Sequence, residues 1–115
     1  MAKYEDHLSC RFRDLLAYLD ASILGGSISA SYEDGSTFYE GEIQCVSRVY
    51  ERYSYLGNNR VSLNVTLFGS DGNVHLSAIT SGGSQAMFFK LNTFGEGAFL
   101  DKFIDAVERF KHQAR

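Results

Sequence analysis

Side chains that could bind a ligand occur at alternate positions in three short stretches of the sequence. Guanidinium and phenol groups alternate with other residues at Arg48, Tyr50 and Arg52. The other two stretches contribute amide, hydroxyl, aromatic and imidazole groups, at Asn64, Thr66, Phe68, His75 and Ser77. Guanidinium groups form paired hydrogen bonds with anions, and aromatic rings stack on planar groups such as RNA bases. If the fold brings these side chains together, they form a surface suited to a planar or anionic ligand.

Two of these stretches lie within residues 60–80, where apolar and polar residues alternate on both sides of Asp71-Gly72. This pattern predicts a β-hairpin with a two-residue turn, which pairs Leu67 with Leu76 and Val65 with Ala78. One face is then apolar and made of Leu63, Val65, Leu67, Val74, Leu76 and Ala78. The other face carries Asn64, Thr66, Phe68, His75, Ser77 and Ile79.

The third stretch lies in a strand that we expect to begin after a break at Gly41. A loop at residues 57–59 would pair Tyr53 with Leu63 and Val49 with Leu67. The polar face then carries three rows: Arg52 beside Asn64 and Ile79, Tyr50 beside Thr66 and Ser77, and Arg48 beside Phe68 and His75. Glu51 does not fit this register, because it faces Val65 on the core side.

The N-terminal part of the chain predicts a helix and a hairpin. Residues 4–24 have apolar side chains at helical spacing and are followed by Gly25-Gly26, which suits a left-handed helix C-cap. Residues 27–33 alternate and lead to a turn at Asp34-Gly35. A three-residue loop with a bulge at Gly35 places Phe38 inward, whereas a two-residue loop places Tyr39 inward.

The C-terminal part predicts a flexible turn at residues 81–85, a strand at 86–92 and a helix that begins with a capping box at Thr93 and Glu96. The apolar stripe of this helix is Phe99, Leu100, Phe103, Ile104, Val107 and Phe110. The whole chain therefore predicts an α+β two-layer sandwich. Its order is N-terminal helix, antiparallel meander of five to six strands, and C-terminal helix, with both helices on one sheet face.

Composition limits the classes of protein that this chain can belong to. Its 115 residues, 44% hydrophobic and 22% charged, suit one globular domain spanning residues 1–115. A net charge of -3 gives no general basis for nucleic-acid binding. The sequence has neither an apolar run of about 20 residues nor a signal peptide at its start, so we expect a cytoplasmic protein.

Motifs for catalysis or metal binding are absent from the sequence. His7, His75 and His112 lack metal-ligand spacing, and no nucleophile motif surrounds any serine or cysteine. Cys10 and Cys45 lack a CxxC partner, and we expect both to be reduced. No metal, cofactor or catalytic residue is therefore predicted, and His75 is the only starting point for an enzyme.

Two segments carry a resemblance to a known family. EDGSTFYEGEIQ and SGGSQAMFFKLNTFGEGAFLDKF resemble a family of small bacterial proteins that is described only as a domain of unknown function. The resemblance covers nearly the whole chain and implies no catalytic residues. The order of elements is also similar to frataxin-like folds and to secretion-chaperone-like folds. The first helix has few acidic residues, unlike the former, and a middle helix is missing, unlike the latter.

Three interpretations of the polar sheet face are open. It is a solvated face of ordinary strand residues, a surface for a protein partner, or a site for a nucleic acid or a small ligand. We expect a non-enzymatic cytosolic protein-interaction module that forms a homodimer through this open sheet face or through a strand edge. The alternative is a protein that binds a small molecule or anion with Arg48, Tyr50, Arg52, Phe68 and His75.

Overall fold

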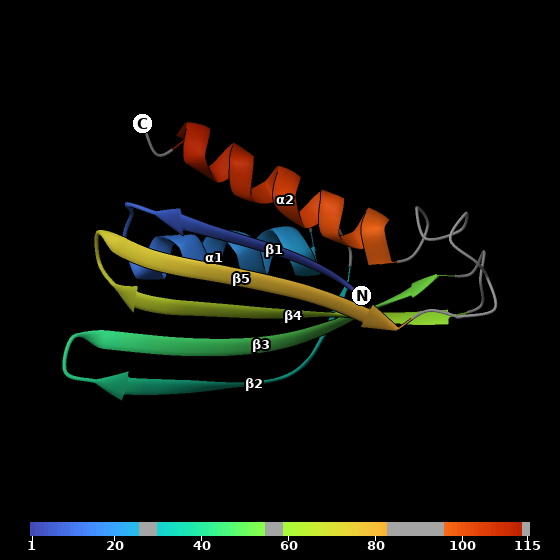
Figure 1. Cartoon of the computed structure of the whole chain (residues 1–115), viewed down its shortest axis with the longest axis horizontal. Helices are drawn as coiled ribbons and strands as arrows, with labels where there is room; N and C mark the ends of the chain where they lie inside the picture. The colour runs from blue at the N-terminus through green and yellow to red at the C-terminus, as the bar shows by residue number, and fades with distance from the viewer. Residues whose placement is uncertain (26–29, 55–58, 83–95, 114–115) are drawn as a thin grey trace.

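The computed structural model describes residues 1–25, 30–54, 59–82 and 96–113, which form one antiparallel sheet and two helices (Figure 1). The strand order across the sheet is β1-β5-β4-β3-β2. The strands are β1 (Ala2–Leu8), β2 (Ser31–Glu40), β3 (Ile43–Ser54), β4 (Asn59–Ser70) and β5 (Asn73–Gly82). The helices are α1 (Phe12–Leu24) and α2 (Glu96–Gln113). The predicted α+β class is confirmed, while the strand expected at 86–92 and the cap at Thr93 lie outside the described residues.

The central hairpin has the register that its sequence predicts. Leu67 pairs with Leu76, Val65 with Ala78 and Gly69 with Val74, around a two-residue turn at Asp71-Gly72. Every member of the predicted core face is buried: Leu63, Val65, Leu67, Val74, Leu76 and Ala78. A slip by one residue would bring the polar side chains to the core, so this burial pattern maintains the register.

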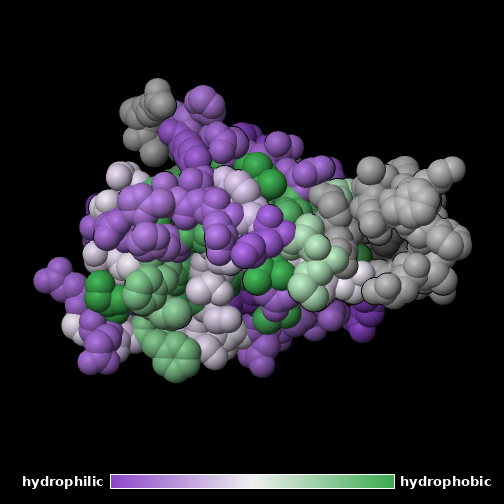
Figure 2. Space-filling model, in the orientation of Figure 1, coloured by the Kyte–Doolittle hydropathy of each residue, from purple (hydrophilic) through white to green (hydrophobic). Residues whose placement is uncertain are grey.

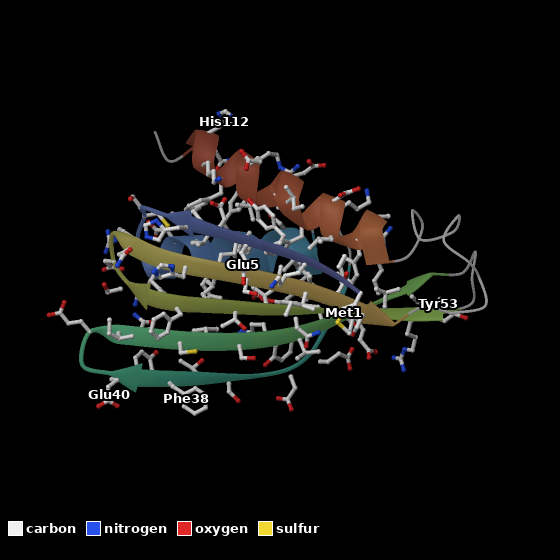
Figure 3. All side chains as sticks on the ribbon, in the orientation of Figure 1. Met1, Glu5, Phe38, Glu40, Tyr53 and His112 are labelled. Carbon is white, nitrogen blue, oxygen red and sulfur yellow. The ribbon has the colours of Figure 1, made fainter. Side chains whose placement is uncertain are left out.

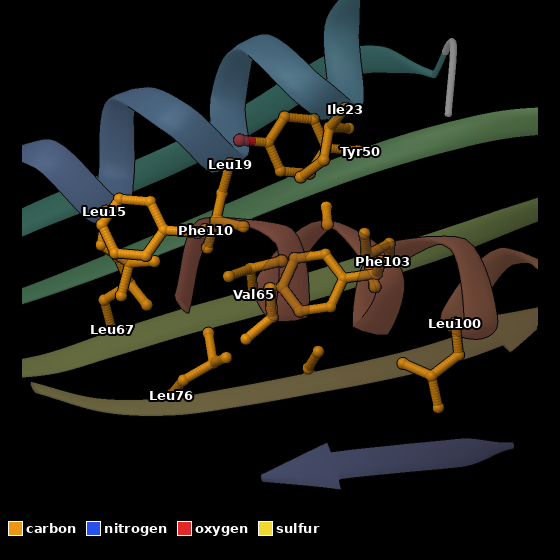
Figure 4. Packing of buried hydrophobic residues seen from close by; sticks show 14 of the residues in the cluster. Leu15, Leu19, Ile23, Tyr50, Val65, Leu67, Leu76, Leu100, Phe103 and Phe110 are labelled. Atoms are coloured by element: carbon orange, nitrogen blue, oxygen red, sulfur yellow. The ribbon is translucent and has the colours of Figure 1, made fainter. Parts of the chain in front are cut away.

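Both helices pack on that apolar face, which completes the two-layer arrangement (Figures 1 and 4). Leu15, Leu19 and Ile23 of α1 belong to the same buried cluster as Phe99, Phe103 and Phe110 of α2. The opposite face of the sheet is not covered by any of the described elements, and we call it the open face. Any function of the sheet surface must use the open face or the margins that the helices leave uncovered.

The first element of the chain is a strand, so the prediction of one helix over residues 4–24 is wrong for its first part. β1 pairs along its whole length with β5, and its residues alternate between the helix-covered face and the open face. This pairing satisfies the backbone N–H and C=O groups along the outer edge of β5. Those groups would stay unpaired if residues 4–8 were part of the helix. The helix ends at Leu24 as expected, but Gly25 has φ -125° and is not the predicted left-handed cap.

The predicted turn at Asp34-Gly35 is also wrong. β2 runs through these residues to Glu40, and its pairing with β3 shifts by one residue between Tyr32 and Asp34. The chain turns instead at Gly41, whose φ of 61° is the left-handed conformation that glycine adopts without strain. Because β3 offers a partner strand of matching length, Asp34 and Gly35 pair with Val49 and Arg48 and do not turn the chain, and the bulge lies just before them at Glu33.

The third correction concerns the register of β3. Val46 pairs with Leu67 and Tyr50 pairs with Leu63, whereas the prediction placed Val49 and Tyr53 at these positions. The difference is three residues, an odd number, and it exchanges the two faces of β3. Glu51 therefore pairs with Ser62, away from the core, and forms an ion pair with Arg60 at 3.1 Å.

Candidate functional site

The open face is arranged as rows of side chains that cross the whole sheet, since residues paired across antiparallel strands point to the same side. One row contains an imidazole, a second imidazole, a phenyl ring, a thiol and a second phenyl ring. In order from β1 to β2 these residues are His7, His75, Phe68, Cys45 and Phe38. We call this set the aromatic row.

Ring contacts connect one end of the aromatic row. The ring centroids of His7 and His75 are 4.7 Å apart, and those of Phe68 and His75 are 6.4 Å apart. A hydrogen bond joins Nε2 of His7 to Oδ1 of Asn73. The imidazole end of the row is thus organised by side-chain contacts, whereas Phe38 at the other end lies on the edge strand β2.

The neighbouring row is polar. It consists of Glu5, Ser77, Thr66, Ser47 and Ser36. Where the two rows meet over β1, β5 and β4, the surface forms a hollow of about 270 Å³ lined in part by Glu5, Phe68 and His75. Hydroxyl, carboxylate and imidazole groups in this hollow can form hydrogen bonds, but no arginine of the described residues lines it.

The other end of the aromatic row is apolar and exposed. Phe38 is 65% exposed, Phe68 49% and Ile43 38%. Ile43 lies two residues before Cys45 in β3 and therefore points to the same face. Figure 2 shows apolar side chains gathered over this end of β2, β3 and β4, and Figure 3 shows Phe38 at the outer margin of the sheet. We call Phe38, Ile43, Cys45 and Phe68 the apolar patch.

The predicted site is divided between the two faces of the sheet. Asn64, Thr66, Phe68, His75 and Ser77 lie together on the open face, as predicted. Arg48, Tyr50 and Arg52 do not join them, because the register of β3 turns these three side chains to the helix-covered face. The prediction that all of these residues share one face is therefore wrong.

The three displaced residues have separate surroundings. Tyr50 is 1% exposed and its phenol donates a hydrogen bond to Oδ1 of Asp20 at 2.6 Å. Burial, followed by the Asp20 carboxylate, raises the pKa of Tyr50 well above its ordinary value. The guanidinium of Arg52 lies 5.8 Å from the centre of the Phe99 ring, a cation–π contact, while Arg48 reaches towards β2.

Sequence reasoning missed His7, Cys45 and Phe38 as members of the open face. The helix predicted over residues 4–24 includes His7, although Lys3, Glu5 and His7 alternate with Tyr4 and Leu8, a pattern typical of an edge strand that only Asp6 interrupts. In the predicted register Cys45 shares the core side with Val49, and the three-residue loop with a bulge at Gly35 places Phe38 inward. Pairing the buried Val46 and Tyr50 with the hairpin core, in place of Val49 and Tyr53, would have placed Cys45 on the open face.

Chemistry on the open face consists of stacking, hydrogen bonding and apolar contact. Within the described ranges, no group of three His, Cys, Asp or Glu side chains is arranged to hold a metal ion. None of the helices in the described part of the chain is long and apolar enough to cross a membrane.

Comparison with known proteins identifies a family. A family model described as "Family of unknown function (DUF6054)" matches residues 1–111. The chain belongs to this family. The match to DUF6054 confirms the resemblance to a domain of unknown function and includes every element of the open face. No curated protein and no solved structure matches the chain. The arrangement of side chains is consequently the basis for any functional proposal about this member of DUF6054.

Proposed function

We propose that this chain is a cytoplasmic protein-interaction module that forms a homodimer by packing the open faces of two copies together. The observation that carries the proposal is the apolar patch, in which the exposed side chains of Phe38, Ile43 and Phe68 surround Cys45 at one end of the sheet. Exposed apolar groups gathered in one patch are typical of protein contacts, whereas scattered ones are ordinary.

The dimensions of the open face match a stable interface. Five strands about 4.8 Å apart and about ten residues long cover roughly 800 Å², which is the area that each partner buries in a standard interface. Two sheets that pack face to face lie about 10 Å apart with side chains interdigitating. The open face is thus large enough for a second copy without any contribution from the helices.

The two ends of the aromatic row are complementary to each other. A two-fold axis that runs along the central strand β4, between the two sheets, places β2 of one copy over β1 of the other. Phe38 then faces His7 of the second copy, and Phe68 faces its own equivalent. The charges also match, because this arrangement places Asp34 on β2 of one copy over Lys3 on β1 of the other.

Pairing of two β2 edges is the competing geometry. The strand is exposed along its length and would offer unpaired backbone groups to a second strand. However, β2 contains Glu33, Asp34 and Glu40 and no basic residue. Two antiparallel copies of β2 would therefore bring like charges close together, which destabilises cross-strand pairs.

The alternative function, binding of a small molecule or anion by the same face, has less support. It relied on the guanidinium groups of Arg48 and Arg52, and both lie on the helix-covered face. The hollow on the open face is lined by Glu5, and none of the arginines in the part of the chain that the structure describes lines it in compensation. An anion would be repelled there, so we favour the protein contact.

The test compares two neighbouring residues that point to opposite faces. Phe38 and Tyr39 are 65% and 69% exposed on the same edge strand, so substituting either with aspartate should leave the fold intact. We expect the unmodified chain to sediment as a dimer at protein concentrations of about 100 µM, in the range where weak interfaces form. Phe38→Asp should sediment as a monomer, because it places a charge in the apolar contact, and Tyr39→Asp should remain a dimer.

Three results would contradict the open-face dimer. A monomeric unmodified chain would remove the proposal altogether. Dissociation by both variants would indicate pairing through the β2 edge, and persistence of the dimer in both would place the contact elsewhere. Circular dichroism of each variant shows whether any change in mass reflects unfolding.

A further inference from the structure

A second hollow lies on the helix-covered side of the sheet, between α1 and the edge strand β2. Its volume is about 480 Å³, which is the size of an ordinary small-molecule site. The helix contributes Asp20 and Leu24, β2 contributes Tyr32, Ser36 and Thr37, and β3 contributes Arg48. We call this hollow the α1–β2 groove. It is independent of the open face and goes beyond the proposed homodimer.

Asp20 is held in position by a buried tyrosine. Tyr50 extends from β3 towards α1 (Figure 4), and its phenol donates a hydrogen bond to Oδ1 of Asp20 at 2.6 Å. The second carboxylate oxygen, Oδ2, receives no hydrogen bond from any described residue. Asp20 therefore presents a fixed negative charge to the groove with one oxygen available to a ligand.

Arg48 presents the opposite charge without a carboxylate partner. Its part-buried guanidinium donates only to the backbone oxygen of Ser47, at 3.3 Å, and no ion pair links it to an acidic residue in the described ranges. A guanidinium has five N–H donors, and the part-buried Arg48 uses one of them in its hydrogen bond to Ser47. Its other donors are available to a ligand with a carboxylate or similar group.

The backbone of β2 is shaped to let these side chains approach. A Cβ atom on Gly35 would lie 2.5 Å from the oxygen of Ser47, 3.0 Å from the hydroxyl of Tyr32 and 3.1 Å from Cδ of Arg48. Glycine is needed at this position chiefly because a side chain would clash with the backbone oxygen of Ser47, and Tyr32 and Arg48 fill the remaining space beside it. Tyr32 in turn packs edge to face on Tyr50, with ring centroids 5.9 Å apart.

From these contacts we propose that the α1–β2 groove binds a small zwitterion of the amino-acid type. The ligand's carboxylate pairs with Arg48 and with the hydroxyl of Thr37, and its ammonium group pairs with Oδ2 of Asp20. A simple anion would be repelled by Asp20 and a simple cation by Arg48, so a ligand with both charges fits best. Tyr32 and Leu24 form the wall for its side chain.

The experiment is isothermal titration calorimetry with the twenty standard amino acids, together with β-alanine and γ-aminobutyrate to vary the spacing of the two charges. Phenylpropionate and phenethylamine serve as probes that carry only one charge. We expect at least one amino acid to bind and both single-charge probes to bind at least about tenfold more weakly, since a charged hydrogen bond is lost.

The variants are chosen to keep the fold. Asp20→Asn retains the oxygen that accepts the hydrogen bond from Tyr50 but removes the charge, and Arg48→Gln removes the guanidinium. Each should weaken binding of the amino acid by about tenfold or more, because each loses one charged hydrogen bond. Arg52→Gln is the matched control, because Arg52 lies on the same strand and face but contacts Phe99 instead of the groove.

Three outcomes overturn the proposal. No binding by any amino acid shows that the groove is not such a site. Equal binding of phenylpropionate shows an anion site that depends on Arg48 alone, and an equal loss in Arg52→Gln shows that the effect is not local. Phe38→Asp should bind the amino acid like the unmodified chain, so failure of the dimer and failure of this site can be told apart.

Discussion

The carboxylate of Asp71 accepts a hydrogen bond from the backbone N–H of Phe12 at 2.9 Å. Asp71 belongs to the turn between β4 and β5, and Phe12 is the first residue of α1. Arg11, at the N-cap position, forms no side-chain cap, so a residue distant in sequence provides this contact. In the same place the N–H of Gly72 donates to the oxygen of Cys10 at 2.7 Å. The hairpin turn thus fixes where the first helix begins.

Substituting Asp71 with alanine should lower the free energy of unfolding by about 1 kcal/mol, the usual value of a helix N-cap. The loss combines an unsatisfied N–H at the start of α1 with the absence of a negative charge near the positive end of the helix. Urea denaturation measures the change. Asp105→Ala, on the exposed side of α2, is the control and should change stability by less than about 0.5 kcal/mol.

The assignment of faces in the central hairpin can be tested at two adjacent positions. Val65 is 3% exposed in the core, whereas Thr66 points to the open face. Val65→Asp should unfold the domain, because a buried unpaired charge costs several kcal/mol, and Thr66→Asp should leave it folded. Far-ultraviolet circular dichroism distinguishes the two results, and equal damage by both variants would contradict the assignment.

Gly69 should tolerate substitution far less well than Gly41, although both have positive φ angles of 141° and 61°. A Cβ atom on Gly69 would lie 2.1 Å from the backbone oxygen of Asn73, but one on Gly41 would meet nothing within 4 Å. We expect Gly41→Ala to destabilise the fold by about 1 kcal/mol through backbone strain alone. Gly69→Ala should destabilise it by several-fold more, and urea denaturation of the two variants measures the difference. Similar values for both variants would argue against a clash at the β4–β5 turn.

Acid should weaken the attachment of α2 to the sheet. Burial by itself raises the pKa of Asp6, but hydrogen bonds from Lys111, Tyr4 and the backbone of His7 outweigh it and hold this pKa below its usual 3.8. A depressed pKa in the folded state stabilises the protein above the unfolded-state pKa, near 4, and this contribution disappears as the pH falls through the folded-state value. Stability should therefore decline below about pH 4.

The variant Asp6→Asn isolates this effect. It should be less stable than the unmodified chain at pH 7, and the difference should shrink as the pH is lowered through the range where Asp6 accepts a proton. Urea unfolding at a series of pH values measures the difference. A gap that stays constant down to about pH 2 would show that the ion pair with Lys111 does not contribute in this way.

Local signals predicted the parts of the fold that depend on neighbouring residues. The turn at Asp71-Gly72 joins its two strands directly, so alternation on both sides determined every pair in the hairpin. The apolar spacing in residues 99–110 likewise indicated α2 and its buried side. The five candidate residues that lie within this hairpin were therefore placed correctly on the open face.

Errors arose where a partner strand lies far away or across a longer connection. Residues 55–58 separate β3 from β4, so local sequence did not determine the register, and a shift of three residues moved Arg48, Tyr50 and Arg52 to the other face. β1 became a strand because β5, about seventy residues later in the sequence, offers it backbone hydrogen bonds. The Asp34-Gly35 pair became part of a continuous strand for the same reason, since β3 runs alongside it and pairs with both residues.

By itself the sequence determined the central hairpin, the C-terminal helix and the two-layer class, because hydrophobic periodicity and short turns act over a few residues. Only the tertiary structure decided which side chains meet on each surface, including the aromatic row and the pairing of Asp20 with Tyr50. The physical reason is that side chains alternate with a period of two along a strand. When the register between two strands that are distant in sequence shifts by an odd number of residues, the two faces of the shifted strand are therefore exchanged. The energy that selects one register comes from burial of apolar side chains across the whole sheet.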